Sequence, residues 1–154
     1  MRNLRCYLAG SMTGSKASTA LEWRQHAFNR LSKYGLDVYS PTRGKTFDPT
    51  HPIAIDSEKA IGGPENTSRA INMRDYLDTT KADCLLVFLD TTTPLPSMGT
   101  VAEMAWAFDR RIPIVCCVPE DSLYMRHPMV SEFITYRVDT IDQGIDIVIS
   151  VLLP

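Results

Sequence analysis

Short, almost wholly apolar runs alternate along this chain with longer segments of helical periodicity, and this alternation limits what the chain can fold into. Runs such as Cys84–Leu89 and Pro113–Val118 lack the polar alternation of a strand with one face in water. They are therefore typical of strands buried on both faces of a parallel sheet. Parallel strands need helical crossovers between them. The sequence therefore predicts an α/β fold, a doubly wound sandwich around a parallel sheet.

The bounds of the expected elements follow from these runs and from helix start and stop signals. The capping-box pattern Thr19-Ala-Leu-Glu22 predicts the start of the first helix, and Gly35 predicts its end. Asp139 or Thr140 is expected to cap the last helix, which runs to Leu153. Strands are expected over residues 4–9, 36–39, 84–89, 113–118 and 135–138. Further helices are expected over residues 65–81, 100–111 and 129–133.

Residues 40–64 interrupt this pattern, because the segment is rich in proline and glycine and shows little periodicity. Long loops in compact domains often act as lids or binding segments, so we expect this loop to line a ligand pocket. No repeat, low-complexity tract or change of composition marks a domain boundary. A chain of 154 residues can bury one substantial core. We therefore expect a single domain over residues 1–154.

The bulk composition excludes several classes of protein. The net charge of −2 gives no reason to expect a nucleic-acid partner. No apolar run reaches the length of a membrane span, and the N-terminal apolar stretch is too short for a signal peptide. We therefore expect a cytoplasmic protein with no membrane partner.

Cofactor signals are also missing from the sequence. The four cysteines lie in apolar runs without a Cys-x-x-Cys spacing, and the three histidines are scattered. We therefore expect reduced, buried thiols and no metal site. The sequence also lacks Gly-x-x-x-x-Gly-Lys-Ser/Thr, which excludes a P-loop, and Gly-x-Gly-x-x-Gly after the first strand. No cofactor is expected.

Two acidic residues follow the apolar run Cys84–Leu89. Asp90 ends the run, and Glu103 lies in the first turn of the helix expected after it. Ligands of open α/β sheets bind at the carboxyl ends of the strands, and two carboxyl groups facing one crevice are the minimum for glycosidic-bond chemistry. The competing interpretation makes Asp90 a turn residue and Thr100-Val-Ala-Glu103 a capping box.

The residues before Glu103 favour a functional role for it. Ser97, Gly99 and Thr100 bring small and hydroxyl-bearing side chains to a helix N-terminus, which is a natural site for a polar ligand. The helix dipole there would also keep the carboxylate of Glu103 ionised, as a nucleophile requires.

Further candidates lie elsewhere along the chain. Asp75, on the helix over 65–81, is either a functional carboxyl group or a solvated one. Tyr7, in the first strand, is a site residue or a core tyrosine. Gly10 and Ser11 follow that strand, where the backbone can approach a ligand closely. His127, held extended before a proline, is a ligand contact or an inert surface residue.

Taken together, these residues resemble the nucleoside 2-deoxyribosyltransferase family over most of the chain. The motifs that carry the resemblance are Tyr7-Leu-Ala-Gly10, Asn72-x-x-Asp75, Asp90 and Ser97-x-Gly99-Thr100-x-x-Glu103, of which the last is the most specific. The resemblance implies a flavodoxin-like fold with a five-stranded parallel sheet.

The resemblance also implies roles for individual residues. Glu103 would be the nucleophile that attacks the anomeric carbon, and Tyr7 would orient it. Asp75 and Asp90 would hold the base and supply or accept its proton. Gly10, Ser11, Ser97, Gly99 and Thr100 would contact the substrate.

The family completes its site with an Asn-x-Met segment from a neighbouring subunit. The matching spacing in this chain is His127-Pro-Met129, in which histidine replaces asparagine. The resemblance therefore implies a homo-oligomer, a dimer or higher, with shared active sites.

The activity implied is exchange of the base of a 2′-deoxyribonucleoside through a covalent deoxyribosyl-Glu103 intermediate, with retention of configuration. The partners would be nucleosides or nucleotides and free nucleobases. One alternative is an N-glycosidase that hydrolyses a nucleoside 5′-monophosphate, because such enzymes resemble this chain at Gly10-Ser11 and Ser97-x-Gly-Thr. A non-catalytic nucleotide-binding module on the same fold is a further alternative.

Overall fold

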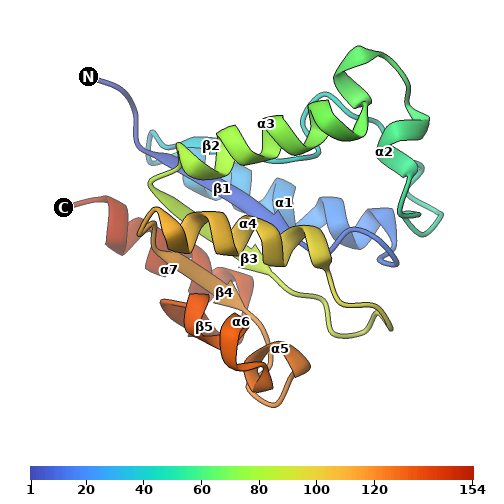
Figure 1. Ribbon diagram of the computed structural model, residues 1–154. Coiled ribbons are helices and arrows are strands. Elements are labelled where there is room, and N and C mark those ends of the chain that lie inside the picture. Colours follow the sequence, from blue (N-terminus) through green and yellow to red (C-terminus); the bar gives the residue numbers. More distant parts are fainter.

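A single five-stranded sheet forms the centre of the protein, whose computed structural model describes residues 1–154. The strands are β1 (Arg5–Gly10), β2 (Asp37–Tyr39), β3 (Cys84–Phe88), β4 (Ile114–Cys117) and β5 (Tyr136–Val138). They pair in the order β2-β1-β3-β4-β5, and all four pairings are parallel (Figure 1). The expected α/β doubly wound fold is therefore confirmed.

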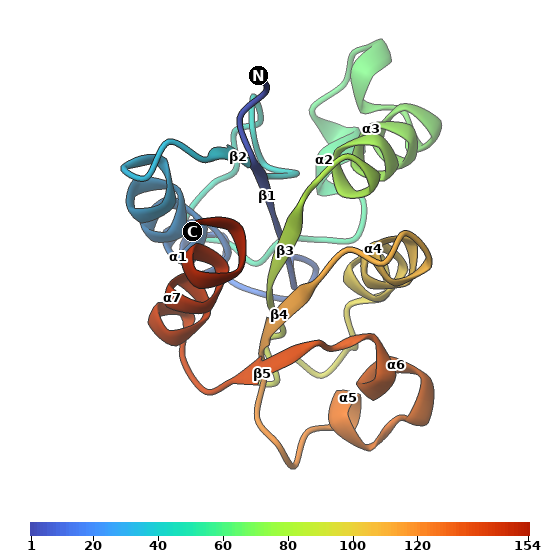
Figure 2. The same ribbon diagram turned by 90° about the vertical axis from the view of Figure 1, so that its left-hand side faces the viewer.

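Helices cover both faces of this sheet. The long helices are α1 (Ala17–Ser32), α3 (Ser68–Thr80), α4 (Met98–Asp109) and α7 (Ile141–Leu152). Figure 2 shows α1 and α7 on one face and α3 and α4 on the other. The short helices α5 (Leu123–Arg126) and α6 (Pro128–Phe133) lie on the α4 side, between β4 and β5 in the chain. No helix combines the length and the apolar composition needed to cross a membrane.

The alternation of side chains along β1 places Tyr7 on the face that α4 covers. Cys6 and Leu8 belong to the core cluster under α1 and α7, whereas Tyr7 and Ala9 belong to the cluster that contains Met104 of α4. Successive residues of a strand point to opposite faces of the sheet. The side chain of Tyr7 therefore points from the sheet toward α4.

The first helix begins earlier than its sequence predicts. It begins at Ala17, after Lys16, and no side chain caps it, so the capping box expected at Thr19-Ala-Leu-Glu22 is wrong. Tertiary contacts fix the start instead: Lys16 forms a bridge with Pro52 of the long loop, and Ala17 is wholly buried. The cap expected at Asp139 or Thr140 does form: Thr140 caps the last helix, in a capping box with Gln143.

Two further helix starts differ from expectation. The helix expected from residue 65 begins at Ser68, where the side chain of Thr67 accepts the N–H of Ala70, and a short 3-10 turn precedes it. The helix expected from Thr100 begins at Met98, after Ser97. Glu103 is therefore its sixth residue and lies in the second turn, so the capping box with Thr100 does not form.

The long loop over residues 40–64 contains one short helix, α2 (Ser57–Ala60). Figure 1 shows α2 at the end of the molecule where α3 and α4 begin, which is also the end where the strands terminate. A bridge between Thr13 and Ile53 attaches the loop to the turn after β1. The loop therefore closes over the carboxyl edge of the sheet.

Candidate active site

The strand order reverses between β1 and β3, since the chain leaves β1 for β2 on one side and returns to β3 on the other. Open α/β sheets bind ligands outside the carboxyl ends of their strands at such a switch point. Gly10 ends β1 at this point. A Cβ atom on Gly10 would lie 2.6 Å from the carbonyl oxygen of Phe88 and 2.8 Å from the ring of Trp23. Only glycine fits at this position, where β1 ends close to the backbone of β3 and to Trp23.

A cavity of about 370 Å³ opens beside Gly10. Its lining includes Asp75, Glu103 and Thr100, together with Glu58 of α2. A second cavity of about the same volume shares Asp75, Glu103 and Glu58 and continues toward α3. Cavities of this size accommodate small-molecule ligands.

The carboxyl group of Glu103 is buried in the wall of this cavity. Glu103 is only 7% exposed, and its Oε1 accepts a hydrogen bond of 3.0 Å from the Tyr7 hydroxyl. Tyr7 is itself fully buried. The other carboxyl oxygen of Glu103, Oε2, accepts no hydrogen bond from the protein. Tyr7 thus fixes one oxygen of Glu103 and leaves the other free.

Burial raises the pKa of Glu103 to about 8, and the neighbouring charge of Asp75 adds to the shift. The hydrogen bond from Tyr7 and the charge of Arg24 act in the opposite direction and lower this pKa. The expectation that the helix dipole keeps Glu103 ionised is therefore wrong. Glu103 lies in the second turn, and the dipole effect is confined to the first.

Asp75 projects from α3 into the same cavity and is not a solvated surface residue. Its side chain is 13% exposed, and its Oδ1 is buried without a hydrogen-bond partner. Burial raises the pKa of Asp75 to about 6, and the charge of Glu58 raises it further, against Lys45 and Arg74. A carboxyl group with a pKa near neutrality can both donate and accept a proton at physiological pH.

Asp90 does not line the cavities of Glu103, and its carboxylate is hydrogen-bonded to nearby residues. Its carboxylate accepts from the hydroxyl of Ser15 at 3.1 Å and from the N–H and hydroxyl of Thr92 at 2.9 and 2.6 Å. The bond to the Thr92 N–H is the local contact of a turn, and the catalytic role of Asp90 stays a prediction. Ser11 is also buried, and its hydroxyl accepts the N–H of Asp90 at 3.0 Å.

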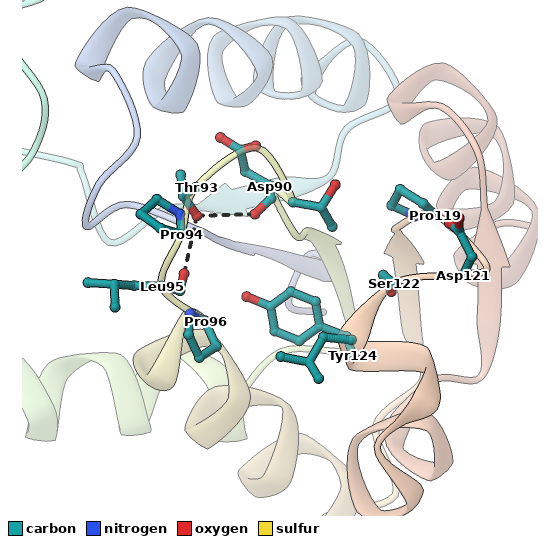
Figure 3. A pocket seen from close by; sticks show the side chains of 11 residues that line it. Asp90, Thr93, Pro94, Leu95, Pro96, Pro119, Asp121, Ser122 and Tyr124 are labelled. Atoms are coloured by element: carbon teal, nitrogen blue, oxygen red, sulfur yellow. Dashed lines mark hydrogen bonds between the residues drawn. The ribbon is translucent and has the colours of Figure 1, made fainter.

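Asp90 lines a different cavity, of about 310 Å³, which lies between the loop after β3 and α5. Figure 3 shows Asp90 and Thr93 on one side of this cavity and Ser122 and Tyr124 on the other. Leu95 borders both this cavity and the one that contains Glu103. The structure therefore brings Tyr7, Asp75 and Glu103 together, whereas Asp90 lines the neighbouring cavity.

The start of α4 presents polar groups to the cavity of Glu103. Ser97, Gly99 and Thr100 all line it, and the hydroxyls of Ser97 and Thr100 lie 2.7 Å apart. A Cβ atom on Gly99 would meet nothing within 4 Å, so open space lies before it. The N–H groups of Gly99 and Thr100 have no acceptor in the protein, as at most helix starts. These groups are free to bind a polar ligand.

His127 and Met129 lie outside both cavities lined by Glu103. They flank the start of α6, and both are exposed. Within one chain, the structure does not place them in the cavities that Glu103 and Asp75 line. Their contribution to the site of a neighbouring subunit stays a prediction.

Sequence reasoning missed one buried cation beside the site. Arg24 of α1 is 3% exposed and donates to the carbonyl oxygens of Gly10 and Ala20 at 3.0 and 2.6 Å. Burial lowers its pKa to about 10, against the charge of Glu103. A signal for it existed, because Arg24 stands at helical spacing with the buried residues Ala20, Ala27 and Leu31.

Sequence reasoning also missed the ion pair between Lys45 and Glu58. Both residues belong to the loop over 40–64. Their pairing depends on how this loop folds back over the sheet. No periodic pattern in the loop indicates it.

The fold and the carboxyl pair define the class of protein: an α/β domain with a small-molecule site at the switch point of its sheet. The sequence profile of the family Nucleoside 2-deoxyribosyltransferase matches residues 6–147. Because this match spans most of the chain, the protein belongs to that family. Comparison with curated proteins gives no match.

Several solved structures share this fold. The solution structure of BlsM is 20% identical, with a TM-score of 0.62 over 96% of this chain and 88% of the other. The Moco carrier protein from Chlamydomonas reinhardtii is 17% identical, with a TM-score of 0.64 over 98% of both chains. The CMP N-glycosidase BcmB from Clostridium botulinum is 16% identical, with a TM-score of 0.53 over 94% of this chain and 97% of the other. Identities this low show similarity of fold alone.

Proposed function

We propose that the protein is a nucleoside 2′-deoxyribosyltransferase, which exchanges the base of a 2′-deoxyribonucleoside through a covalent deoxyribosyl-Glu103 intermediate with retention of configuration. The observation that carries the proposal is the buried Glu103 carboxyl group, which accepts the Tyr7 hydroxyl at 3.0 Å and shares its cavity with Asp75. Two carboxyl groups with separate environments can take the separate roles of nucleophile and proton donor.

In the first half-reaction, Oε2 of Glu103 bonds to the anomeric carbon while the bond from that carbon to the base nitrogen breaks. The electron pair of the broken bond goes to the base, and Asp75 supplies the proton that neutralises it. The cationic character that develops on the sugar is stabilised by the carboxylate beside it. In the second half-reaction, an acceptor base attacks from the same face, Glu103 leaves, and Asp75 takes the proton of the incoming base.

A second candidate is hydrolysis of a nucleoside 5′-monophosphate, in which water replaces the acceptor base. The observation that favours it is the start of α4, where Ser97, Gly99 and Thr100 line the cavity and the N–H groups of Gly99 and Thr100 have no acceptor in the protein. Helix N-termini of this kind bind phosphate groups. Glu103 and Asp75 would keep the same roles.

A chromatographic assay separates these activities. Thymidine or deoxycytidine is incubated with the protein, with and without free adenine. Deoxyadenosine formed only in the presence of adenine supports the transferase. Free base released without any acceptor supports a hydrolase, and the assay is then repeated with the 5′-monophosphates. Unchanged substrates in every arm contradict both proposals and favour a binding module.

A further inference from the structure

We propose that Glu58 is a specificity-determining residue that reads the base and favours bases with an exocyclic amino group. This inference deepens the proposed function and rests on it for the orientation of the substrate. It starts from a third carboxyl group in the cavity, beside the two that the family motifs identify. Glu58 lies in the loop over residues 40–64, outside all of those motifs.

The position of Glu58 is at the base end of the cavity. It lines both cavities that Asp75 and Glu103 line. Among neighbouring charges, Glu58 has the largest effect on the pKa of Asp75, whereas at Glu103 the charges of Asp75 and Arg24 both exceed it, as expected if Glu58 lies on the Asp75 side. Glu103 must face the sugar and Asp75 the base, since Asp75 transfers the base's proton. A substrate placed in this way presents its base to Glu58.

Lys45 holds the Glu58 carboxylate in place. The side chain of Lys45 is 2% exposed, and its ammonium group forms an ion pair with Oε2 of Glu58. A buried ammonium group is costly unless it is paired, so this contact fixes the orientation of Glu58. The other oxygen, Oε1, accepts no hydrogen bond from the protein. Glu58 thus keeps one carboxylate oxygen without a partner in the protein, on a side chain that lines the cavity.

A carboxylate oxygen accepts hydrogen bonds and cannot donate them. It therefore binds the amino group of cytosine or adenine and repels the carbonyl oxygen that uracil and hypoxanthine carry at the same ring position. Discrimination through one such contact is typically tenfold or more. The other side chains around Glu58 in these cavities include the apolar Ile55 and Ile71, which contact a base without discriminating these groups.

The test compares deoxycytidine with deoxyuridine as deoxyribosyl donors, because the two carry an amino group and a carbonyl oxygen at the same position and differ otherwise only in the proton on the adjacent ring nitrogen. The matched purine pair is deoxyadenosine and deoxyinosine. For the wild-type protein, we expect kcat/KM to be about tenfold or more higher for the amino-bearing member of the accepted pair. In Glu58→Gln, whose amide can donate to a carbonyl oxygen, we expect this ratio to fall to about one or below.

Two further variants separate base reading from general damage. Lys45→Met frees the Glu58 side chain and should lower the ratio while leaving some preference. Glu65→Gln is the matched control, since Glu65 is exposed and lines neither cavity; its ratio should equal that of the wild type. A Glu58→Gln protein that is active and keeps the wild-type ratio would overturn the inference.

Binding to an inactive protein tests the inference independently of turnover. Calorimetric titration of free cytosine and uracil, or adenine and hypoxanthine, into Glu103→Gln should show tighter binding of the amino-bearing base. The added change Glu58→Gln should remove that preference. A preference in binding without turnover by the wild type would contradict the proposed function alone. Equal binding of both bases to both proteins would contradict the role of Glu58.

Discussion

At the scale of single residues, the state of the Glu103 carboxyl group decides both activity and stability. Its pKa is raised to about 8 by burial, well above that of an unfolded glutamate. The folded protein therefore binds more protons than the unfolded chain between about pH 5 and pH 8. Stability contributed by the protonated group is present at low pH and is lost as pH rises through this window.

We therefore expect Glu103→Gln to abolish turnover and to stabilise the fold at pH 8. The amide cannot act as a nucleophile, but its oxygen can still accept the Tyr7 hydroxyl. The free energy of unfolding of this variant should exceed that of the wild type by roughly 1–3 kcal/mol at pH 8, and by less at pH 5. Urea unfolding at both pH values measures the difference. The exposed Glu22→Gln serves as the control, and wild-type turnover in Glu103→Gln would refute the nucleophile.

The pH dependence of activity should follow the same two carboxyl groups. The productive form needs Glu103 ionised and Asp75 protonated, whereas their pKa values of about 8 and about 6 favour the opposite arrangement. We expect kcat/KM to be highest near pH 7 and to fall below pH 6 and above pH 8. A profile that rises steadily through pH 9 would contradict this assignment of roles.

Removal of the Tyr7 hydroxyl should move this profile in a defined direction. The hydrogen bond from Tyr7 lowers the pKa of Glu103, so Tyr7→Phe should shift the alkaline limb of kcat/KM to higher pH. Activity at pH 7 should fall roughly tenfold, which corresponds to about one pKa unit. The control is Tyr34→Phe, because Tyr34 is exposed. A uniform loss at every pH, without movement of the limb, would mean that Tyr7 acts only through packing.

Some site residues could be predicted from the sequence and others could not. The difference is whether a sequence motif or only tertiary packing places a residue at the site. Tyr7, Asp75 and Glu103 belong to the motifs that carry the family resemblance, so their proximity could be predicted. Arg24 and Glu58 act through contacts that form only after α1 and the long loop pack on the sheet. Asp90 was expected at the same crevice; it lines the neighbouring cavity and is hydrogen-bonded to Ser15 and Thr92.

At the scale of elements, strands were easier to predict than helix starts. The apolar runs place each strand within two residues of its observed bounds. A helix start depends on which backbone N–H groups find partners, and tertiary contacts can supply those. The capping-box pattern occurs at Thr19 and at Thr140, yet only Thr140 caps a helix.

This difference gives a stability prediction. Thr140→Ala removes the bond from the Thr140 hydroxyl to the N–H of Gln143, and should lower the free energy of unfolding by about 1 kcal/mol. Thr19→Ala is the matched control, because Thr19 is exposed inside α1 and caps nothing. Thermal unfolding of both variants measures the effect. Equal melting temperatures for the two would show that the Thr140 cap contributes nothing.

At the scale of the whole molecule, the cavities that Glu103 lines contain neither His127 nor Met129, which the family resemblance implies as contacts from a neighbouring subunit. Both residues are exposed at the start of α6. The parallel sheet with helices on both faces could be predicted from the alternation of strands and helices. The placement of α6 relative to a second copy could not, because it depends on an interface between chains.

A shared site makes mixed oligomers informative. We expect His127→Ala to weaken substrate binding, seen as a higher KM, and Glu103→Ala to be inactive. If each site takes His127 from a neighbouring subunit, an oligomer of the two variants contains sites with both an intact Glu103 and an intact His127. Co-expression with two different tags isolates such mixed oligomers. Their kcat/KM should exceed that of either parent, whereas no recovery in verified mixtures would place His127 outside the partner's site.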